Sequence, residues 1–194
     1  MARIVLIRHG ESVANAERRF TVGPFEPLTA RGRGEAIAVG RAVRARFDPV
    51  ALYTSPFVRA LETARHLGGL LGLDPVVVED LREQDFGELR GRSYGDYAGD
   101  PSAQGIGRWE HRPPGGETLL EVARRAGAAL DALAKAHLGQ EIVVVSHGAV
   151  MAALRGHAAG HYRAAPQPTR NCGGYVLSWR SGTWEGPEEL ELGA

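Results

Sequence analysis

Short apolar runs alternate along the chain with longer stretches of helical periodicity. Aliphatic and β-branched residues dominate the runs near 4–7, 50–53, 76–78 and 142–145. Runs of this length, bounded by turn residues, are typical of buried strands. The predicted strands span 3–8, 50–54, 75–78 and 141–146, with a final ribbon at 174–180 and 188–192.

Helix start signals stand between these strands. Thr29 is a predicted N-cap, and Ser55 before Pro56 combines a capping hydroxyl with the imino acid that suits a first helical position. Thr118, followed three residues later by Glu121, matches a capping box. The predicted helices span 29–47, 55–71, 118–136 and 150–157.

The order of these elements indicates the α/β fold class. Alternating strands and helices place helices on both faces of a mostly parallel central sheet, a three-layer α/β/α arrangement. The length of 194 residues suits a single domain over 1–194. Periodicity fails between residues 80 and 116, which we predict to be a cap or substrate-loop region. Ligands of such sheets bind beyond the carboxyl ends of the strands.

The dipeptide His-Gly follows two of the predicted strands. The apolar run at 4–7 leads into Arg8-His9-Gly10-Glu11, and the run at 142–145 leads into Ser146-His147-Gly148. Histidine is the side chain best suited to act as nucleophile or proton carrier near neutral pH. Two histidines at carboxyl strand ends therefore predict a shared site.

The cations near these histidines point to phosphate. Arg8 precedes His9, and Arg59 lies in the first turn of the helix that begins at Ser55. Arginine grips phosphate with paired hydrogen bonds, and a helix N-terminus adds free N–H groups. We predict that His9 attacks phosphorus as a neutral imidazole while Arg8 and Arg59 balance the charge. His147 would add to that charge in its protonated form.

The leaving alkoxide needs a proton, which a carboxyl group can donate. Four carboxyl groups are candidates: Glu11, Glu83, Asp85 and Glu88. Glu83 is preferred because it follows the third predicted strand, again at a carboxyl end. The substrate wall is expected from the loops at 20–25 and 82–112. Their aromatic and cationic residues are Phe20, Phe25, Tyr94, Trp109, Arg82, Arg90, Arg92, Arg108 and Arg112.

Composition excludes several other functions. The 23 basic and 23 acidic residues cancel, which argues against a nucleic-acid binder. No apolar stretch approaches the ~20 residues that cross a bilayer, and no leader-like segment opens the chain, so no membrane partner and a cytoplasmic location are expected. Cys172 is the single cysteine, and no histidine pair has metal-ligand spacing with carboxylates, so neither a disulfide nor a metal site is predicted.

Read together, the motifs resemble the histidine phosphatase superfamily, in its phosphoglycerate-mutase-like branch. The resemblance covers nearly the whole chain, from the first strand to Asn171-Cys172. The matching segments are Arg8-His9-Gly10-Glu11 with Asn15, Leu28-Thr29 with Gly32, Ser55-Pro56 with Arg59-Ala60 and Thr63-Ala64, Leu81-Arg82-Glu83 with Phe86-Gly87, Pro114-Gly115-Gly116-Glu117-Thr118, and Ser146-His147-Gly148.

The resemblance implies a role for each matched residue. His9 would be the phosphorylated nucleophile, and Arg8, Arg59 and His147 would hold the phosphoryl group. Asn15 and the backbone at Gly148 would donate further hydrogen bonds. Glu83 would act as general acid and then as general base toward water. No cofactor and no metal would be needed.

The resemblance leaves three functions to choose between, and two departures from the family pattern bear on the choice. Glycolytic mutases of this branch carry an added arginine- and proline-rich stretch, which the short segment 94–114 does not match. A second departure is Leu89-Arg90-Gly91, where many members have Trp-Glu-Gly. The preferred function is therefore a metal-independent phosphatase of small phosphate monoesters. The alternatives are a phosphoglycerate mutase and a non-catalytic phospho-ligand binding module. The partner is a small phosphorylated metabolite, and the edge of the final ribbon suits a homodimer.

Overall fold

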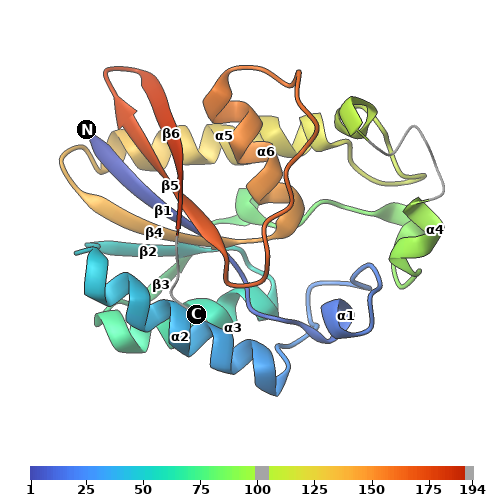
Figure 1. Cartoon of the computed structure of the whole chain (residues 1–194), viewed down its shortest axis with the longest axis horizontal. Helices are drawn as coiled ribbons and strands as arrows, with labels where there is room; N and C mark the ends of the chain where they lie inside the picture. Colours follow the sequence, from blue (N-terminus) through green and yellow to red (C-terminus); the bar gives the residue numbers. More distant parts are fainter. Residues whose placement is uncertain (99–104, 191–194) are drawn as a thin grey trace.

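The apolar runs at 4–7 and 142–145 lie side by side at the centre of a six-stranded sheet (Figure 1). The structure is a computed structural model that describes residues 1–98 and 105–190. The strand order is β3-β2-β4-β1-β5-β6. The strands are β1 Ala2–Arg8, β2 Ala51–Thr54, β3 Pro75–Val77, β4 Glu141–Ser146, β5 Gly174–Arg180 and β6 Thr183–Glu189.

The sheet is mostly parallel, as predicted. Strands β3, β2, β4 and β1 run in one direction, whereas β5 pairs antiparallel with β1 and with β6. The register places Arg8 opposite Ser146 and Thr54 opposite Val145. The residues that follow β1, β2 and β4 therefore emerge at one edge of the sheet.

Helices cover both faces of the sheet and bury two separate apolar layers (Figure 1). Helices α2 and α3 pack on one face, against Val5, Leu52 and Val143. Helices α5 and α6 pack on the other, against Ile4, Leu6 and Val144. The helices are α1 Val13–Ala16, α2 Ala30–Arg46, α3 Val58–Leu71, α4 Tyr94–Ala98, α5 Leu119–Ala136 and α6 Gly148–Ala159. The predicted three-layer α/β/α fold is confirmed.

Two of the predicted helix starts are confirmed and one is wrong. Thr29 accepts a hydrogen bond from the Gly32 N–H, and Thr118 forms the reciprocal capping box with Glu121. Helix α3 begins at Val58 instead of at Ser55-Pro56. The Ser55 hydroxyl accepts a hydrogen bond from the Phe57 N–H and also contacts a histidine ring, so it caps no helical turn.

Other differences lie in the irregular parts of the chain. The short helix α1 occupies a stretch predicted as loop. The described residues between β3 and α5 form α4 and the 3₁₀ turns Glu79–Leu81, Gly87–Leu89 and Gly105–Trp109. Strand β6 begins at Thr183, before the predicted start at Glu188, because Trp184 pairs with Trp179 across the ribbon. Residues 191 and 192 of that predicted strand lie outside the described residues.

Strand β6 forms one edge of the sheet, where a homodimer stays a prediction. Within the described parts of the chain, no helix combines the length and apolar character needed to cross a membrane.

Candidate active site

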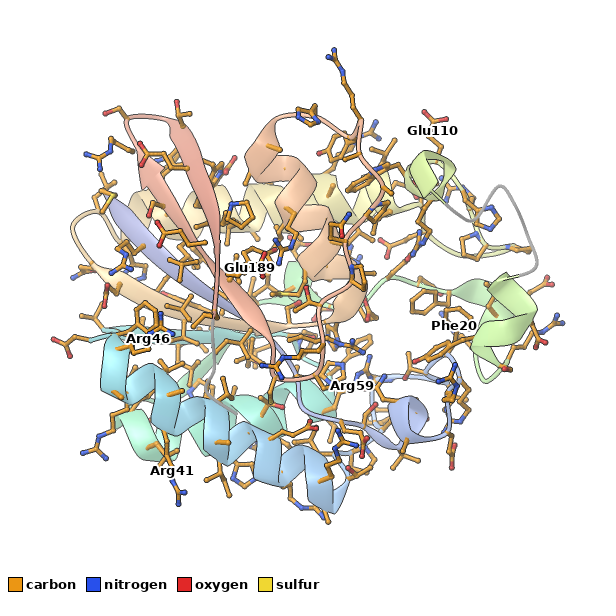
Figure 2. All side chains as sticks on the ribbon, viewed as in Figure 1. Phe20, Arg41, Arg46, Arg59, Glu110 and Glu189 are labelled. Carbon is orange, nitrogen blue, oxygen red and sulfur yellow. The ribbon has the colours of Figure 1, made fainter. Side chains whose placement is uncertain are left out.

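A cavity of about 300 Å³ opens at the carboxyl edge of the sheet. Its floor comes from the segments after β1 and β4, and its wall comes from the loop after α1, the segment after β3 and the connection between α6 and β5. Figure 2 shows Arg59 near the ends of the central strands and Phe20 farther out, toward α4. Six of the seven predicted site residues line this cavity: Arg8, His9, Asn15, Arg59, Glu83 and Gly148.

His9 is buried and its tautomer is fixed by its neighbours. The Nδ1 atom lies 2.7 Å from the carbonyl oxygen of Gly10, so Nδ1 carries the proton and donates it. The Nε2 atom then has a free lone pair, which accepts a hydrogen bond from Arg59 Nε over 3.1 Å. Burial, followed by the charges of Arg59 and Arg8, holds the pKa of His9 well below its ordinary value. The lowered pKa therefore favours the neutral ring, whose unprotonated Nε2 atom faces Arg59.

His147 packs against His9. Its ring is fully buried and is not among the described residues that line the cavity. The ring centroids of His147 and His9 are 5.1 Å apart in an edge contact, and His147 Nε2 lies 2.6 Å from the hydroxyl of Ser55. Burial, then Arg59, lowers the pKa of His147 well below its ordinary value, which favours the neutral ring.

Arg59 connects the first turn of α3 to His9. Its side chain is buried, and its Nη1 atom donates to the Thr21 hydroxyl over 3.3 Å. Burial lowers the pKa of Arg59, while the carboxylates of Glu83 and Glu26 oppose that shift. The guanidinium remains charged, because arginine does not lose its proton in proteins. Glu26 was missed by sequence reasoning, since nothing in the local pattern separates it from a surface acid.

Arg8 supplies a second cation at the end of β1. Its Nη1 atom donates to the carbonyl oxygen of Thr169 over 2.7 Å. Its Nε atom and the Thr169 hydroxyl are both buried, and neither has a hydrogen-bond partner among the described residues. The Nδ1 atom of His147 is in the same condition. Buried polar atoms without partners are rare, and both Arg8 and Thr169 line the cavity.

Helix α6 begins at Gly148, directly beside Arg8. A β-carbon built at Gly148 would lie 3.5 Å from the Arg8 guanidinium carbon. The N-cap residue, His147, makes no side-chain capping bond, so no side chain caps the N–H groups of the first turn. A helix N-terminus of this kind favours anions.

Glu83 is the only one of the four candidate carboxyl groups that lines this cavity. Its side chain is buried, and Oε1 accepts a hydrogen bond from the Gln84 N–H over 2.9 Å. Glu11 instead accepts from Thr29 at the start of α2, and Asp85 pairs with Arg90. Glu88 is exposed on a 3₁₀ turn.

Asn15 is held in place from two sides. Its Oδ1 atom accepts a hydrogen bond from Asn171 Nδ2 over 3.0 Å, and its Nδ2 atom donates to the Tyr94 hydroxyl over 3.2 Å. Asn171 also donates to the carbonyl oxygen of His9. The amide is thereby fixed where it lines the cavity.

The predicted cavity wall is partly wrong. Phe20, Tyr94 and Arg108 line the cavity, but Phe25 is 83% exposed and lies outside it, and Trp109 is buried against Tyr162. Trp109 donates its indole N–H to the carbonyl oxygen of Ala164 instead. Sequence reasoning missed the wall residues of the α6–β5 connection: Pro166, Gln167, Pro168 and Thr169.

Among the described residues, acidic, histidine and cysteine side chains form no cluster that could hold a metal ion.

Several known proteins share this architecture. The chain is 35% identical to the 2,3-bisphosphoglycerate-dependent phosphoglycerate mutase 2 of Gloeobacter violaceus, over 79% of this chain and 74% of the relative. It is 32% identical to the metal-independent phosphoserine phosphatase of Arabidopsis thaliana, over 79% of this chain and 67% of the relative.

Solved structures agree with the sequence relatives. The mycobacterial glucosyl-3-phosphoglycerate phosphatase in complex with VO3 superposes with a TM-score of 0.84 at 26% identity, covering 97% of this chain and 99% of that one. YhfR of Bacillus stearothermophilus gives a TM-score of 0.83 at 29% identity, covering 95% of each chain. The family model for branch 1 of the histidine phosphatase superfamily matches residues 4–187. The predicted resemblance is confirmed: this chain belongs to the histidine phosphatase superfamily.

Proposed function

We propose that the protein is a metal-independent phosphatase that hydrolyses small phosphate monoesters through a phosphohistidine at His9. One observation carries the proposal. The unprotonated Nε2 atom of His9 lies 3.1 Å from a buried guanidinium, in a cavity that Glu83 also lines. Nucleophile, counter-charge and proton donor thus share one space of about 300 Å³.

In the first step, His9 Nε2 attacks phosphorus. The P–N bond forms as the bond between phosphorus and the ester oxygen breaks, and Glu83 gives its proton to the departing alkoxide. The Nδ1–H of His9 stays hydrogen-bonded to the carbonyl oxygen of Gly10, and this bond stabilises the ring as it gains positive charge.

In the second step, water replaces the alcohol. The Glu83 carboxylate takes a proton from water as the new P–O bond forms and the P–N bond breaks. Inorganic phosphate leaves, His9 returns to the neutral Nδ1–H form, and Glu83 is again protonated. Atoms and charge balance over the two steps.

The phosphoryl oxygens bind to groups already in place. Arg8, Arg59 and the N–H groups at the start of α6 surround the predicted position, and Asn15 stands at its rim. Preorganised donors of this kind usually supply the largest catalytic term. His147 can donate from Nδ1 once a bound dianion raises its pKa, which is the sign that a nearby negative charge gives.

A phosphoglycerate mutase is the second candidate, favoured by the Gloeobacter violaceus relative of that name. A mutase must return the phosphoryl group to a bound alcohol instead of to water. The phosphatase names of the Arabidopsis thaliana relative and the mycobacterial structure support the hydrolase. The binding-module alternative leaves the buried Glu83 in the cavity without a role.

Turnover of an aryl phosphate in the presence of a chelator tests the proposal. We expect activity to persist, His9→Ala to abolish it, and acid-labile phosphate to appear on the wild-type chain after rapid quenching. Activity in His9→Ala would overturn the scheme. A coupled isomerisation assay with and without bisphosphoglycerate separates the mutase, whose turnover would depend on that bisphosphate.

A further inference from the structure

We propose that Arg125, on α5, is the positioning residue that sets the Glu83 carboxyl group against His9. The inference rests on the proposed function, in which Glu83 moves the proton. Arg125 does not line the cavity described above, and no motif in the sequence singles it out.

The Arg125 guanidinium binds the backbone of the segment that carries Glu83. Its Nη1 atom donates to the carbonyl oxygens of Asp80 and Arg82 over 2.7 and 2.8 Å, and its Nη2 atom donates to the carbonyl oxygen of Glu83 over 3.1 Å. A planar group with five fixed donors can serve three carbonyls at once, which a lysine cannot. The last turn before Glu83 is therefore tied to α5 by one side chain.

Glu117 fixes the guanidinium in turn. Arg125 Nε and Nη2 each donate to one carboxylate oxygen of Glu117 over 2.9 Å, in a bidentate pair. Only 11% of the Arg125 side chain is exposed. Burial alone would raise the pKa of Glu117, but the hydrogen bonds from Arg125 and from the Asp85 N–H outweigh it, so the pKa lies below its ordinary value.

Glu117 also binds the residues that follow Glu83. Its carboxylate accepts a hydrogen bond from the Asp85 N–H over 3.0 Å, and its backbone carbonyl oxygen accepts one from Gln84 Nε2 over 2.6 Å. The Gln84 N–H then donates to the Glu83 carboxylate itself. The chain on both sides of Glu83 is thus bound to Arg125 or to its partner Glu117.

This arrangement matters for the reaction because proton transfer depends on position. A small displacement of an acid from the ester oxygen costs much of its catalytic benefit. Alkyl phosphates need that proton, since an alkoxide is a poor leaving group. Dinitrophenyl phosphate does not, since its phenolate leaves unaided. A misplaced Glu83 therefore harms one substrate and spares the other.

The test compares Arg125→Met with Arg124→Met. Arg124 is the exposed neighbour on the same helix, so the pair matches in residue type and helix. We measure kcat/KM, which reports the steps up to the phosphohistidine, on glycerol 2-phosphate and on dinitrophenyl phosphate. We expect Arg125→Met to lose roughly 10- to 100-fold on the alkyl ester and far less on the aryl ester. Arg124→Met is expected to match the wild type on both.

Conservative variants distinguish positioning from loss of the fold. Arg125→Lys keeps the charge but not the fork, so it should lie between Arg125→Met and the wild type on the alkyl ester. Glu117→Gln should reproduce the selective loss if Arg125→Met does not fold. Thermal denaturation of each variant gives its folded fraction at the assay temperature.

Glu83→Gln separates the two ways in which the idea can fail. It should show the same selectivity with a larger loss, about 10²- to 10⁴-fold on the alkyl ester. An equal loss on both esters in Glu83→Gln would overturn the proton-donor role itself. The positioning role alone would be overturned by a different result. In that case Glu83→Gln loses activity selectively on the alkyl ester, while the folded Arg125 and Glu117 variants lose activity equally on both esters or not at all.

Discussion

The Nε atom of Arg59 donates a hydrogen bond to the Nε2 atom of His9, the very nitrogen that is proposed to attack phosphorus. In the proposed mechanism, an entering phosphoryl oxygen would compete with His9 Nε2 for the Arg59 guanidinium and so free the Nε2 lone pair for attack. Anion binding would then also activate the proposed nucleophile.

Loss of the Arg59 guanidinium should affect the chemical step. We expect Arg59→Met to lower kcat/KM on an aryl phosphate by about 10²- to 10³-fold, because one preorganised cation at the transferring oxygens is removed. Arg65→Met, at an exposed position of the same helix, is the matched control and should leave kcat/KM unchanged. An equal effect of the two substitutions would contradict the role of Arg59.

The pH dependence of activity should reflect the environment of His9. Burial and two arginines lower its pKa, so the ring stays neutral in mildly acidic solution. We expect the acid limb of kcat/KM, corrected for the ionisation of the substrate, to fall below the ordinary histidine value of about 6.5. Steady-state rates across this range measure it, and an acid limb above that value would argue against a neutral nucleophile.

Stability should fall in acid for the same reason. Both buried rings have lowered pKa values, so below a pH of about 6.5 the unfolded chain binds protons that the folded chain does not. Each ring then removes up to ~1.4 kcal/mol of unfolding free energy per pH unit, until its folded pKa is reached. Urea denaturation at neutral and acidic pH measures the slope. His147→Gln should flatten it, whereas the exposed His161→Gln should not.

Thr169 offers a test in which activity and stability change differently. Its hydroxyl is buried in the cavity wall and has no hydrogen-bond partner among the described residues. If it binds a phosphoryl oxygen, Thr169→Val should lower kcat/KM by roughly 10- to 100-fold, the value of a hydrogen bond to a charged group. The melting temperature should stay level or rise, because an unsatisfied polar atom is removed. Thr169→Ser keeps the hydroxyl and should retain activity; parallel losses in the two variants would contradict the role.

The sequence predicts the floor of the site better than its wall. His9 and His147 follow apolar runs, and parallel strands bring their carboxyl ends together, so their proximity follows from periodicity and topology. From the sequence alone, Ser55 suits either of two roles, a helix cap or a hydrogen-bond partner for a side chain. Its contact with His147, 92 residues away, decides between them.

The wall depends on contacts that local patterns do not encode. Thr169 reaches Arg8 across 161 residues from a connection without helical or strand periodicity. Trp109 has the composition of a pocket aromatic, yet its indole N–H binds Ala164 and its ring packs on Tyr162. Which aromatic lines a cavity and which anchors a loop is settled by tertiary packing alone.

Strand β5 begins where β1 ends. The Cys172 N–H donates to the carbonyl oxygen of Arg8, and Asn171 donates to that of His9, so this segment binds the backbone of both residues just before β5 begins. On the ribosome, a nascent chain that has emerged only as far as α6 carries His9, Arg8, Arg59 and Glu83, but not residues 166–172. If the cavity binds phosphate esters as proposed, its binding site is completed among the last events of synthesis, and fragments that end at α6 should bind these esters weakly.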